Sequence, residues 1–115
     1  MFSVQLDLGR REHPRVPVRI PALAGAAEGP YHQEAGQVHD LSRGGLRLIL
    51  PKTAAPGAEF RVTLLLRHQP PVAVVGPVVW SRPNPPSSDW AMGIRFRETL
   101  RSELFAEIAA RELAP

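Results

Sequence analysis

Two short polar motifs contain the residue types that could bind an anionic ligand. The first is Arg10-Arg11-Glu12-His13-Pro14-Arg15, and the second is Asp40-Leu41-Ser42-Arg43-Gly44-Gly45. Arginine presents a planar fork of N–H donors that matches phosphate oxygens and base edges, and its flat guanidinium stacks on rings. The second motif adds a carboxylate that accepts hydrogen bonds and a hydroxyl that donates or accepts them. Together the two motifs indicate a site for an anionic partner.

The proline of the first motif decides how its arginines are presented. Pro14 disfavours helical backbone geometry at His13, so Arg11 and Arg15 are not expected to be neighbours on a helix face. We expect them on a mobile, extended or turning N-terminal arm, about residues 1–15, that leads into the first strand and folds over a ligand. A solvated basic arm without a ligand is the alternative.

The second motif is typical of a turn. The side chains of Asp40 and Ser42 can bond nearby backbone amides, and Gly44 or Gly45 can supply a positive φ. A calcium loop is another interpretation, but such a loop needs a bidentate glutamate at its twelfth position, where this chain has Pro51. An ordinary structural turn remains the alternative to a ligand site.

Short segments separated by proline and glycine must position these motifs. Apolar and polar residues alternate most clearly over residues 60–66, which is typical of a half-buried strand. The expected strands are residues 16–22, 34–39, 46–50, 60–66, 72–80 and 90–96. The expected loops are residues 24–31, 51–57 and 82–89. Gly76-Pro77 predicts a bend or bulge within 72–80, and Trp80, Trp90 and Phe96 are expected in the core.

A terminal helix completes the expected fold. Thr99 can cap a helix over about residues 100–113. An apolar stripe at helical spacing marks its buried face: Leu100, Leu104, Phe105 and Ile108. Several short strands followed by one helix predict an all-β barrel or sandwich in which the helix covers an open end.

The bulk composition narrows the class of protein. A chain of 115 residues is expected to be one domain, spanning 1–115. Cysteine is absent, which excludes disulfides and thiolate metal sites. The sequence contains neither an apolar run of about 20 residues nor a leader-like start, so we expect a cytoplasmic protein. Lys52 is the only lysine among the 14 cationic residues, and the other cations are arginines.

The histidines do not predict an enzyme. His13, His32, His39 and His68 have no metal-ligand spacing. His39 beside Asp40 could suggest nucleophilic catalysis, but neighbours on a strand point to opposite faces and no oxyanion-stabilising motif accompanies them. We therefore expect neither catalysis nor a metal or cofactor.

In their order and context, the two motifs resemble the RxxxR and D/NxSxxG signatures of the PilZ domain, a bacterial family of cyclic di-GMP receptors. The likeness extends to Val78-Val79-Trp80 and to Met92-Gly93-Ile94-Arg95-Phe96, and it covers roughly residues 10–105. This resemblance implies a six-stranded antiparallel β-barrel with a C-terminal helix.

The resemblance also implies a set of ligand-binding residues: Arg10, Arg11, Arg15, Asp40, Ser42, Gly44 and Gly45. In the RxxxR roles, Arg11 and Arg15 would clamp phosphate and the O6/N7 edge of guanine, because an arginine fork satisfies both bidentately. Arg10 would add a contact. Asp40 would accept from the N–H donors on guanine's other edge, and Gly45 would let a base approach the backbone closely.

The function implied by the resemblance is a single-domain cyclic di-GMP receptor that signals to a protein partner. Typical outputs in the family are motility, surface adhesion in biofilms and polysaccharide production. One alternative is a PilZ-like interaction module that works independently of cyclic di-GMP. A barrel that binds single-stranded nucleic acid is a third interpretation, but it needs aromatic residues among the basic ones, and only 6% of the chain is aromatic.

Overall fold

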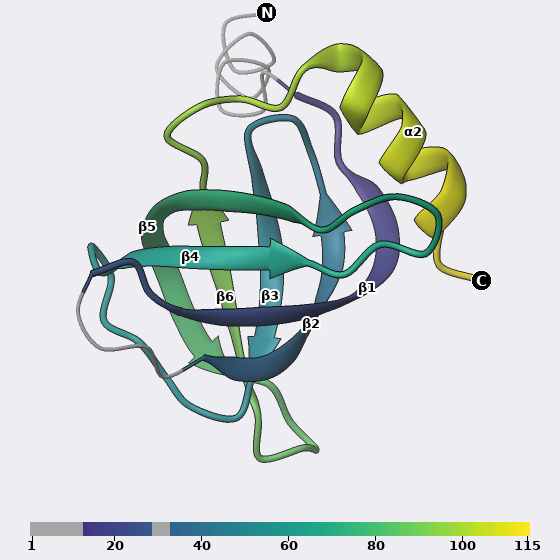
Figure 1. Ribbon diagram of the computed structural model, residues 1–115. Coiled ribbons are helices and arrows are strands. Elements are labelled where there is room, and N and C mark those ends of the chain that lie inside the picture. Colours follow the sequence, from purple (N-terminus) through teal and green to yellow (C-terminus); the bar gives the residue numbers. More distant parts are fainter. Residues whose placement is uncertain (1–12, 29–32) are drawn as a thin grey trace, which may run out of the picture.

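Six strands with alternating inward and outward side chains close into an antiparallel barrel in this computed structural model (Figure 1). The structure describes residues 13–28 and 33–115. Around the barrel the strands follow the order β1-β2-β3-β6-β5-β4. Their bounds are Val16–Ala26 (β1), Glu34–Leu41 (β2), Gly45–Leu50 (β3), Glu59–Leu64 (β4), Val72–Pro83 (β5) and Trp90–Arg95 (β6), and helix α2 spans Ser102–Glu112. The predicted six-stranded antiparallel barrel with a C-terminal helix is confirmed.

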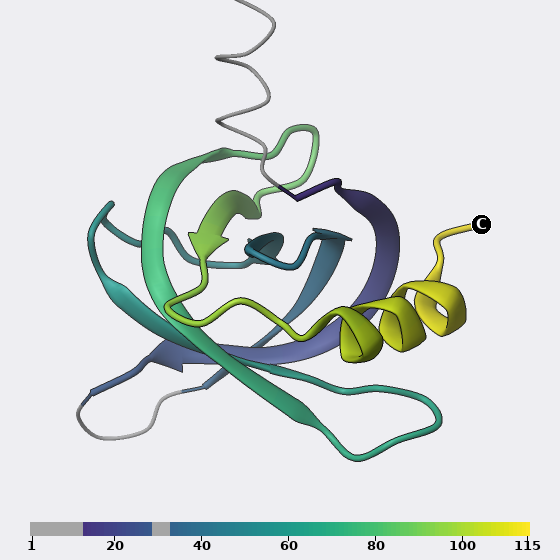
Figure 2. The same cartoon turned by 90° about the horizontal axis from the view of Figure 1, so that it is seen from above.

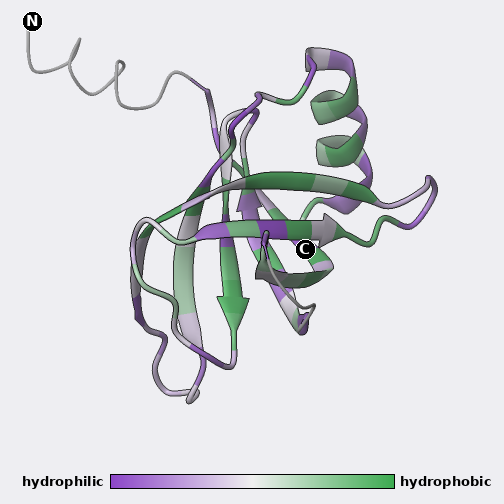
Figure 3. Ribbon diagram, turned by 60° about the vertical axis from the view of Figure 1, so that its left-hand side comes forward, coloured by the Kyte–Doolittle hydropathy of each residue, from purple (hydrophilic) through white to green (hydrophobic). Residues whose placement is uncertain are grey.

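The barrel interior is filled by the apolar residues that the alternation predicts. Leu46, Leu48 and Leu50 of β3 are buried, as are Val62 and Leu64 of β4. Hydrophobic residues lie mainly along the strands in Figure 3. Each such side chain stabilises the fold by about 1.5–3 kcal/mol when fully buried. Since a slip of one residue would turn the leucines of β3 to solvent, the core also sets which side chains face outward.

Strand β1 is longer than the sequence predicts. Residues 24–26 were expected in a loop, but Ala24 pairs with Val62 and Ala26 pairs with Phe60 of β4. The loop prediction is therefore wrong for these three residues, because hydrogen bonding to β2 and β4 outweighs the weak strand propensity of alanine and glycine. Residues 29–31 of the expected loop lie outside the described residues.

The irregularity predicted in β5 is present, but it lies after Gly76-Pro77. Both of these residues stay paired with β4. The pairing with β6 shifts between Val78 and Trp80, so the bulge falls there. Strand β5 then continues to Pro83, into residues that were expected in a loop.

The prediction that Thr99 caps the helix is wrong. The N-cap of α2 is Arg101, which makes no side-chain cap hydrogen bond, and the helix begins at Ser102 rather than Leu100. Leu100 is held by the β2–β3 turn instead. Its N–H donates to the Arg43 carbonyl oxygen at 2.8 Å, and Arg43 Nε donates to the Leu100 carbonyl oxygen at 2.8 Å.

Helix α2 packs shallowly beside the first half of β1 (Figures 1 and 2). Ile108 is buried, while Leu104 and Phe105 are partly buried against the core, so the predicted apolar stripe faces the barrel. Across the part of the chain that the structure describes, no helix is long and apolar enough to cross a membrane.

Candidate ligand-binding site

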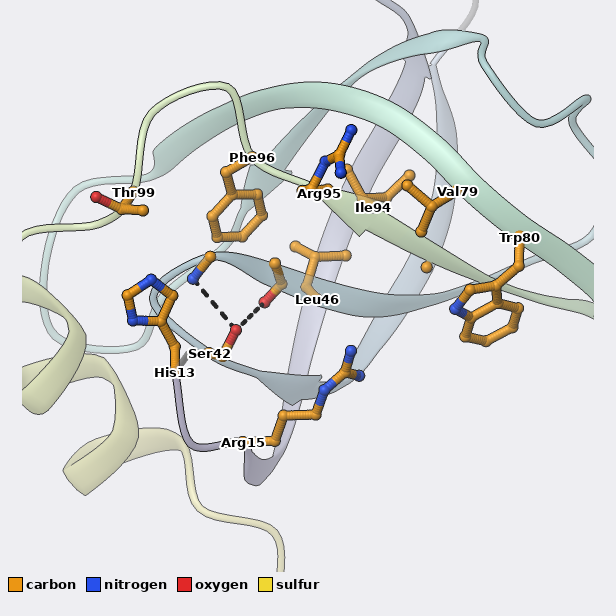
Figure 4. Close-up of a pocket in the computed structure, with 13 residues that line it drawn as sticks. His13, Arg15, Ser42, Leu46, Val79, Trp80, Ile94, Arg95, Phe96 and Thr99 are labelled. Atoms are coloured by element: carbon orange, nitrogen blue, oxygen red, sulfur yellow. Dashed lines mark hydrogen bonds between the residues drawn. The ribbon is translucent and has the colours of Figure 1, made fainter. Parts of the chain in front are cut away.

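A groove lies on the outer wall of the barrel, where the β2–β3 turn meets β6 and β5 (Figure 4). Its volume is about 540 Å³, within the range of small-molecule sites. It is lined by His13, Arg15, Ser42, Gly44, Gly45, Leu46, Val79, Trp80, Gly93, Ile94, Arg95, Phe96 and Thr99. The lining therefore contains His13 and Arg15 from the first motif and three residues of the second.

Two glycines on neighbouring strands form the floor of the groove. Gly45 of β3 pairs with Arg95 of β6, and Gly93 of β6 pairs with Trp80 of β5. The indole of Trp80 lies directly over Gly93, where a Cβ would overlap the ring. The Trp80 ring thus fills the space over Gly93, and the Ile94 carbonyl oxygen fills the space over Gly45, so both glycines allow close packing within the protein itself.

Arg15 lines the groove and contacts Asp40, which is not itself a lining residue. Arg15 Nη1 donates to Asp40 Oδ1 at 3.1 Å, and the two side chains are 44% and 23% exposed. Pairing of Pro17 with Asp40 brings the start of β1 against the end of β2. A guanidinium carries five N–H donors, and within residues 13–28 and 33–115 the side chain of Arg15 uses one of them. The predicted convergence of the first motif with Asp40 is thus observed for Arg15.

Ser42 mainly organises the turn. Its Oγ accepts from the Gly44 N–H at 3.2 Å and donates to the Gly45 carbonyl oxygen at 3.3 Å (Figure 4). The Ser42 N–H also donates to the Gly45 carbonyl oxygen, at 2.9 Å. One lone pair of the hydroxyl is left over, so Ser42 could make at most one further contact as an acceptor.

The turn does not use a positive φ at Gly44 or Gly45, and that prediction is wrong. Among the described residues, only Gly57 has a positive φ, of +94°. Steric crowding explains why glycine occupies these two positions of the motif instead. A Cβ on Gly45 would lie 2.5 Å from the Ile94 carbonyl oxygen, and a Cβ on Gly44 would lie 2.8 Å from the ring of His13. The neighbour that approaches Gly45 is the protein's own strand β6.

The far wall of the groove is aromatic and basic. The bulge in β5 places Val79 and Trp80 in succession outside the core, and Val79 is 44% exposed. Trp80 is only partly buried, so its prediction as a core residue is wrong. The guanidinium of Arg82 lies over the Trp80 ring, 4.7 Å from its centroid, a distance typical of a cation–π contact. Arg95 lies between this wall and the turn (Figure 4).

The other two aromatic predictions are closer to the structure. Phe96 is buried, and Trp90 packs partly buried against the core. Sequence reasoning missed His13, Trp80 and Arg95 as groove residues. A glycine within a strand signals close approach of another group, so Gly93 could have drawn attention to this part of β6. Arg10 and Arg11 lie outside the described residues, as does the arm over residues 1–12.

His39 stands apart from the groove. Its Nε2 lies 3.1 Å from Gln37 Oε1. Burial lowers the pKa of His39 below its ordinary value, and the positive charges of Arg19 and Arg47 lower it further. Within residues 13–28 and 33–115, no three histidine, aspartate or glutamate side chains gather as metal ligands.

These features define the class of protein: a small antiparallel β-barrel with a groove on its outer wall that is lined by arginines and by strand glycines. The family model of the PilZ domain matches residues 9–110. The chain therefore belongs to the PilZ domain family.

Two solved structures share its fold. One is the Bacillus subtilis inhibitor of motility MotI/DgrA, with a TM-score of 0.67 and 16% identity over 86% of this chain and 48% of that one. The other is the PilZ domain with cyclic di-GMP of YcgR from Escherichia coli, with a TM-score of 0.58 and 14% identity over 86% of each chain. The chain thus spans about half the length of MotI. No curated protein sequence matches it.

Proposed function

We propose that this protein is a receptor for cyclic di-GMP and binds it in the groove between Arg15 and Arg95. One observation carries the proposal: Arg15, which lines the groove, meets Asp40, 25 residues further along the chain, at 3.1 Å. Membership of the PilZ family supports it, and so does the fold shared with a YcgR domain solved with this ligand.

The chemistry of the groove suits a ligand with two phosphates and two guanines. Arg15 can offer a bidentate fork to phosphate oxygens or to guanine O6 and N7. Among the described residues only one carboxylate oxygen of Asp40 has a side-chain partner, so the second can accept from guanine N–H donors. Trp80 offers a ring face, and aromatic stacking on a base is worth about 1–3 kcal/mol. From the motif resemblance we also propose contacts to cyclic di-GMP from Arg10, Arg11, Ser42 and Gly44.

The ion pair between Arg15 and Asp40 does not compete strongly with a ligand. Partly exposed pairs contribute only about 0.2–1 kcal/mol, whereas hydrogen bonds to charged groups contribute about 1.5–3 kcal/mol. The pair holds both side chains beside the groove at little cost to binding. The site is therefore partly preorganised before the ligand arrives.

Calorimetry on the purified chain tests the proposal. Arg15→Ala and Asp40→Asn should each weaken binding about tenfold to a hundredfold, since each removes a charge-assisted contact. Arg61→Ala is the matched control, because Arg61 is an exposed arginine of β4 that does not line the groove. A folded protein that binds no cyclic di-GMP at tens of micromolar would refute the receptor and favour a partner-binding module that works without it.

Arg95 provides a second arginine on the opposite side of the floor. It is exposed, and within the part of the chain that the structure describes it makes no ion pair. The nearby Arg97 instead binds both carboxylate oxygens of Glu59, at 2.8 and 2.7 Å. Arg95→Ala should therefore weaken binding about tenfold or more, while Arg97→Ala should leave it within twofold. Equal effects of the two substitutions would remove Arg95 from the site.

The proposed role is binding without catalysis, with a protein partner as the output. Among the described groove residues the Ser42 hydroxyl is hydrogen-bonded within the turn, and the arginines suit recognition of an anion. Motility is the output to test first, because MotI is an inhibitor of motility.

A further inference from the structure

Helix α2 is tied at its N-terminal end to the turn that lines the groove. Arg43 lies inside the second motif, between Ser42 and Gly44, and it exchanges two hydrogen bonds of 2.8 Å with Leu100. The Phe96 N–H also donates to the Gly44 carbonyl oxygen at 2.8 Å. The segment that leads into α2 is therefore fastened to the same turn whose other side faces the groove.

The segment after the C-terminal end of α2 is tied to the start of β1, the strand that follows Arg15. Leu113 forms a β-bridge with Val18, and the Ala114 N–H donates to the Pro17 carbonyl oxygen at 3.1 Å. Strand β4 pairs with β1 only from Ala22 onward, so the end of the chain occupies the free edge of β1 directly after Arg15. Each end of α2 thus contacts one of the two segments that carry the proposed ligand contacts.

The docking of α2 between these two attachments is shallow. Only Ile108 and Glu112 are buried within the helix. The Glu112 side chain is 1% exposed, and its Oε2 accepts from the Arg67 N–H at 3.0 Å. Elements with few buried groups open locally more readily than the core does. The attachments at the helix ends therefore decide much of how firmly α2 stays docked.

We propose that Arg43 is a positioning residue that couples occupancy of the groove to the docking of α2. A ligand that fixes Arg15 and the turn also fixes the two anchors of the helix, and coupling of this kind is reciprocal by thermodynamic necessity. When the groove holds a ligand, α2 is held firmly on the barrel. Its exposed side, which carries Glu103, Glu107 and Arg111, is then fixed in place for recognition by a protein partner. This inference rests on the proposed function.

Hydrogen exchange of the α2 amides, with and without cyclic di-GMP, tests the coupling. In the natural protein the ligand should slow exchange across 105–112 by about 5-fold to 150-fold, the usual span of coupling between sites. The amides of β4 in the core are the reference for global stabilisation. Arg43→Ala removes only the side-chain bond, because the bond from the Leu100 N–H to the Arg43 carbonyl oxygen and the Leu113–Val18 bridge remain. The ligand should therefore still protect the turn, but it should protect α2, relative to β4, less than in the natural protein, and unchanged protection of α2 would overturn the role of Arg43. Arg43→Lys keeps a donor and should restore part of the protection.

A matched variant separates coupling from simple loss of helix stability. Ala106 is exposed on α2, and Ala106→Gly should make the helix roughly fivefold less stable without touching the turn. Ligand-dependent protection of α2 should survive in this variant, although the basal exchange is faster. Loss of protection in Ala106→Gly as well as in Arg43→Ala would overturn the role of Arg43. If the natural protein binds ligand by calorimetry and α2 exchange does not change, the coupling fails while the receptor function stands.

Discussion

Replacing Gly45 with alanine tests whether the last glycine of the second motif serves the fold or the ligand. A Cβ at this position would lie 2.5 Å from the Ile94 carbonyl oxygen, which belongs to the backbone of β6 and cannot rotate away. At the adjacent Gly44, a Cβ would meet only the ring of His13, at 2.8 Å. That ring sits on a side chain that can turn aside. The two neighbouring glycines therefore form a natural pair of test and control.

The size of the effect follows from this contact. Cβ atoms essentially never come closer than 3.0 Å to another heavy atom, so β3 and β6 must separate by about 0.5 Å, the difference between 3.0 and 2.5 Å, in Gly45→Ala. Overpacking typically costs about 1–3 kcal/mol, and alanine returns about 0.4–1 kcal/mol by restricting the unfolded chain. The expected net loss is about 1–2 kcal/mol, or roughly 4–8 °C in Tm. Gly44→Ala should stay within about 0.5 kcal/mol of the natural protein.

Urea unfolding followed by circular dichroism measures both variants, and calorimetry with cyclic di-GMP accompanies it. We expect Gly45→Ala to lose stability whether or not the ligand is present. If Gly45→Ala were as stable as Gly44→Ala and lost only its ligand, the steric argument would be wrong. Gly45 would then serve the approach of the base, as the motif resemblance implies.

Charged and aromatic side chains elsewhere on the barrel and in the groove give three further expectations. His39 should titrate below its ordinary pKa of 6.5, because burial disfavours its charged form. The contribution of neutral His39 to the free energy of unfolding is then present above pH 6.5 and is lost as the pH falls through the folded-state pKa. A titration of His39 followed by NMR with a midpoint at or above pH 6.5 would contradict this. The hydrogen bond from Arg97 lowers the pKa of Glu59, so stability from that pair is present above pH 4.5 and is lost as the pH falls through the lowered pKa. Arg97→Ala should make the free energy of unfolding depend less on pH in the acid range. An unchanged dependence would show that the Arg97–Glu59 pair does not stabilise the fold. In Trp90→Phe only Trp80 emits, and saturating cyclic di-GMP should shift its fluorescence to shorter wavelength, whereas an unchanged spectrum would place the ligand elsewhere.

Local sequence patterns predicted most of the barrel because its strands repeat a period of two. The alternation around Leu46, Leu48 and Leu50 needs no tertiary information, because the polarity of each residue indicates whether it faces the core or the solvent. The patterns failed where a long-range partner decides the structure. Ala24 to Ala26 are extended because β4 pairs with them, and α2 begins late because Arg43 holds Leu100.

The candidate site was only partly accessible from the sequence. Arg15, Asp40 and the motif glycines stand in two recognisable runs, so they could be proposed together. Trp80 and Arg95 come from strands that meet the turn only through the order β3-β6-β5. Nothing local distinguishes a core tryptophan from one that a bulge turns outward. Ser42 also appeared as a ligand contact, although its hydroxyl is mostly used within the turn.

The sequence by itself determined the residue types of the site, the order of the strands along the chain and the exclusion of a calcium loop at Pro51, because these depend on local chemistry and spacing. Only the tertiary structure decided which groups meet. Closure of the barrel sets Arg15 against Asp40, lays Trp80 over Gly93 and fastens the ends of α2 to the β2–β3 turn and to β1. These contacts join residues far apart in the chain, so their geometry depends on strand register and barrel closure, which no local pattern contains.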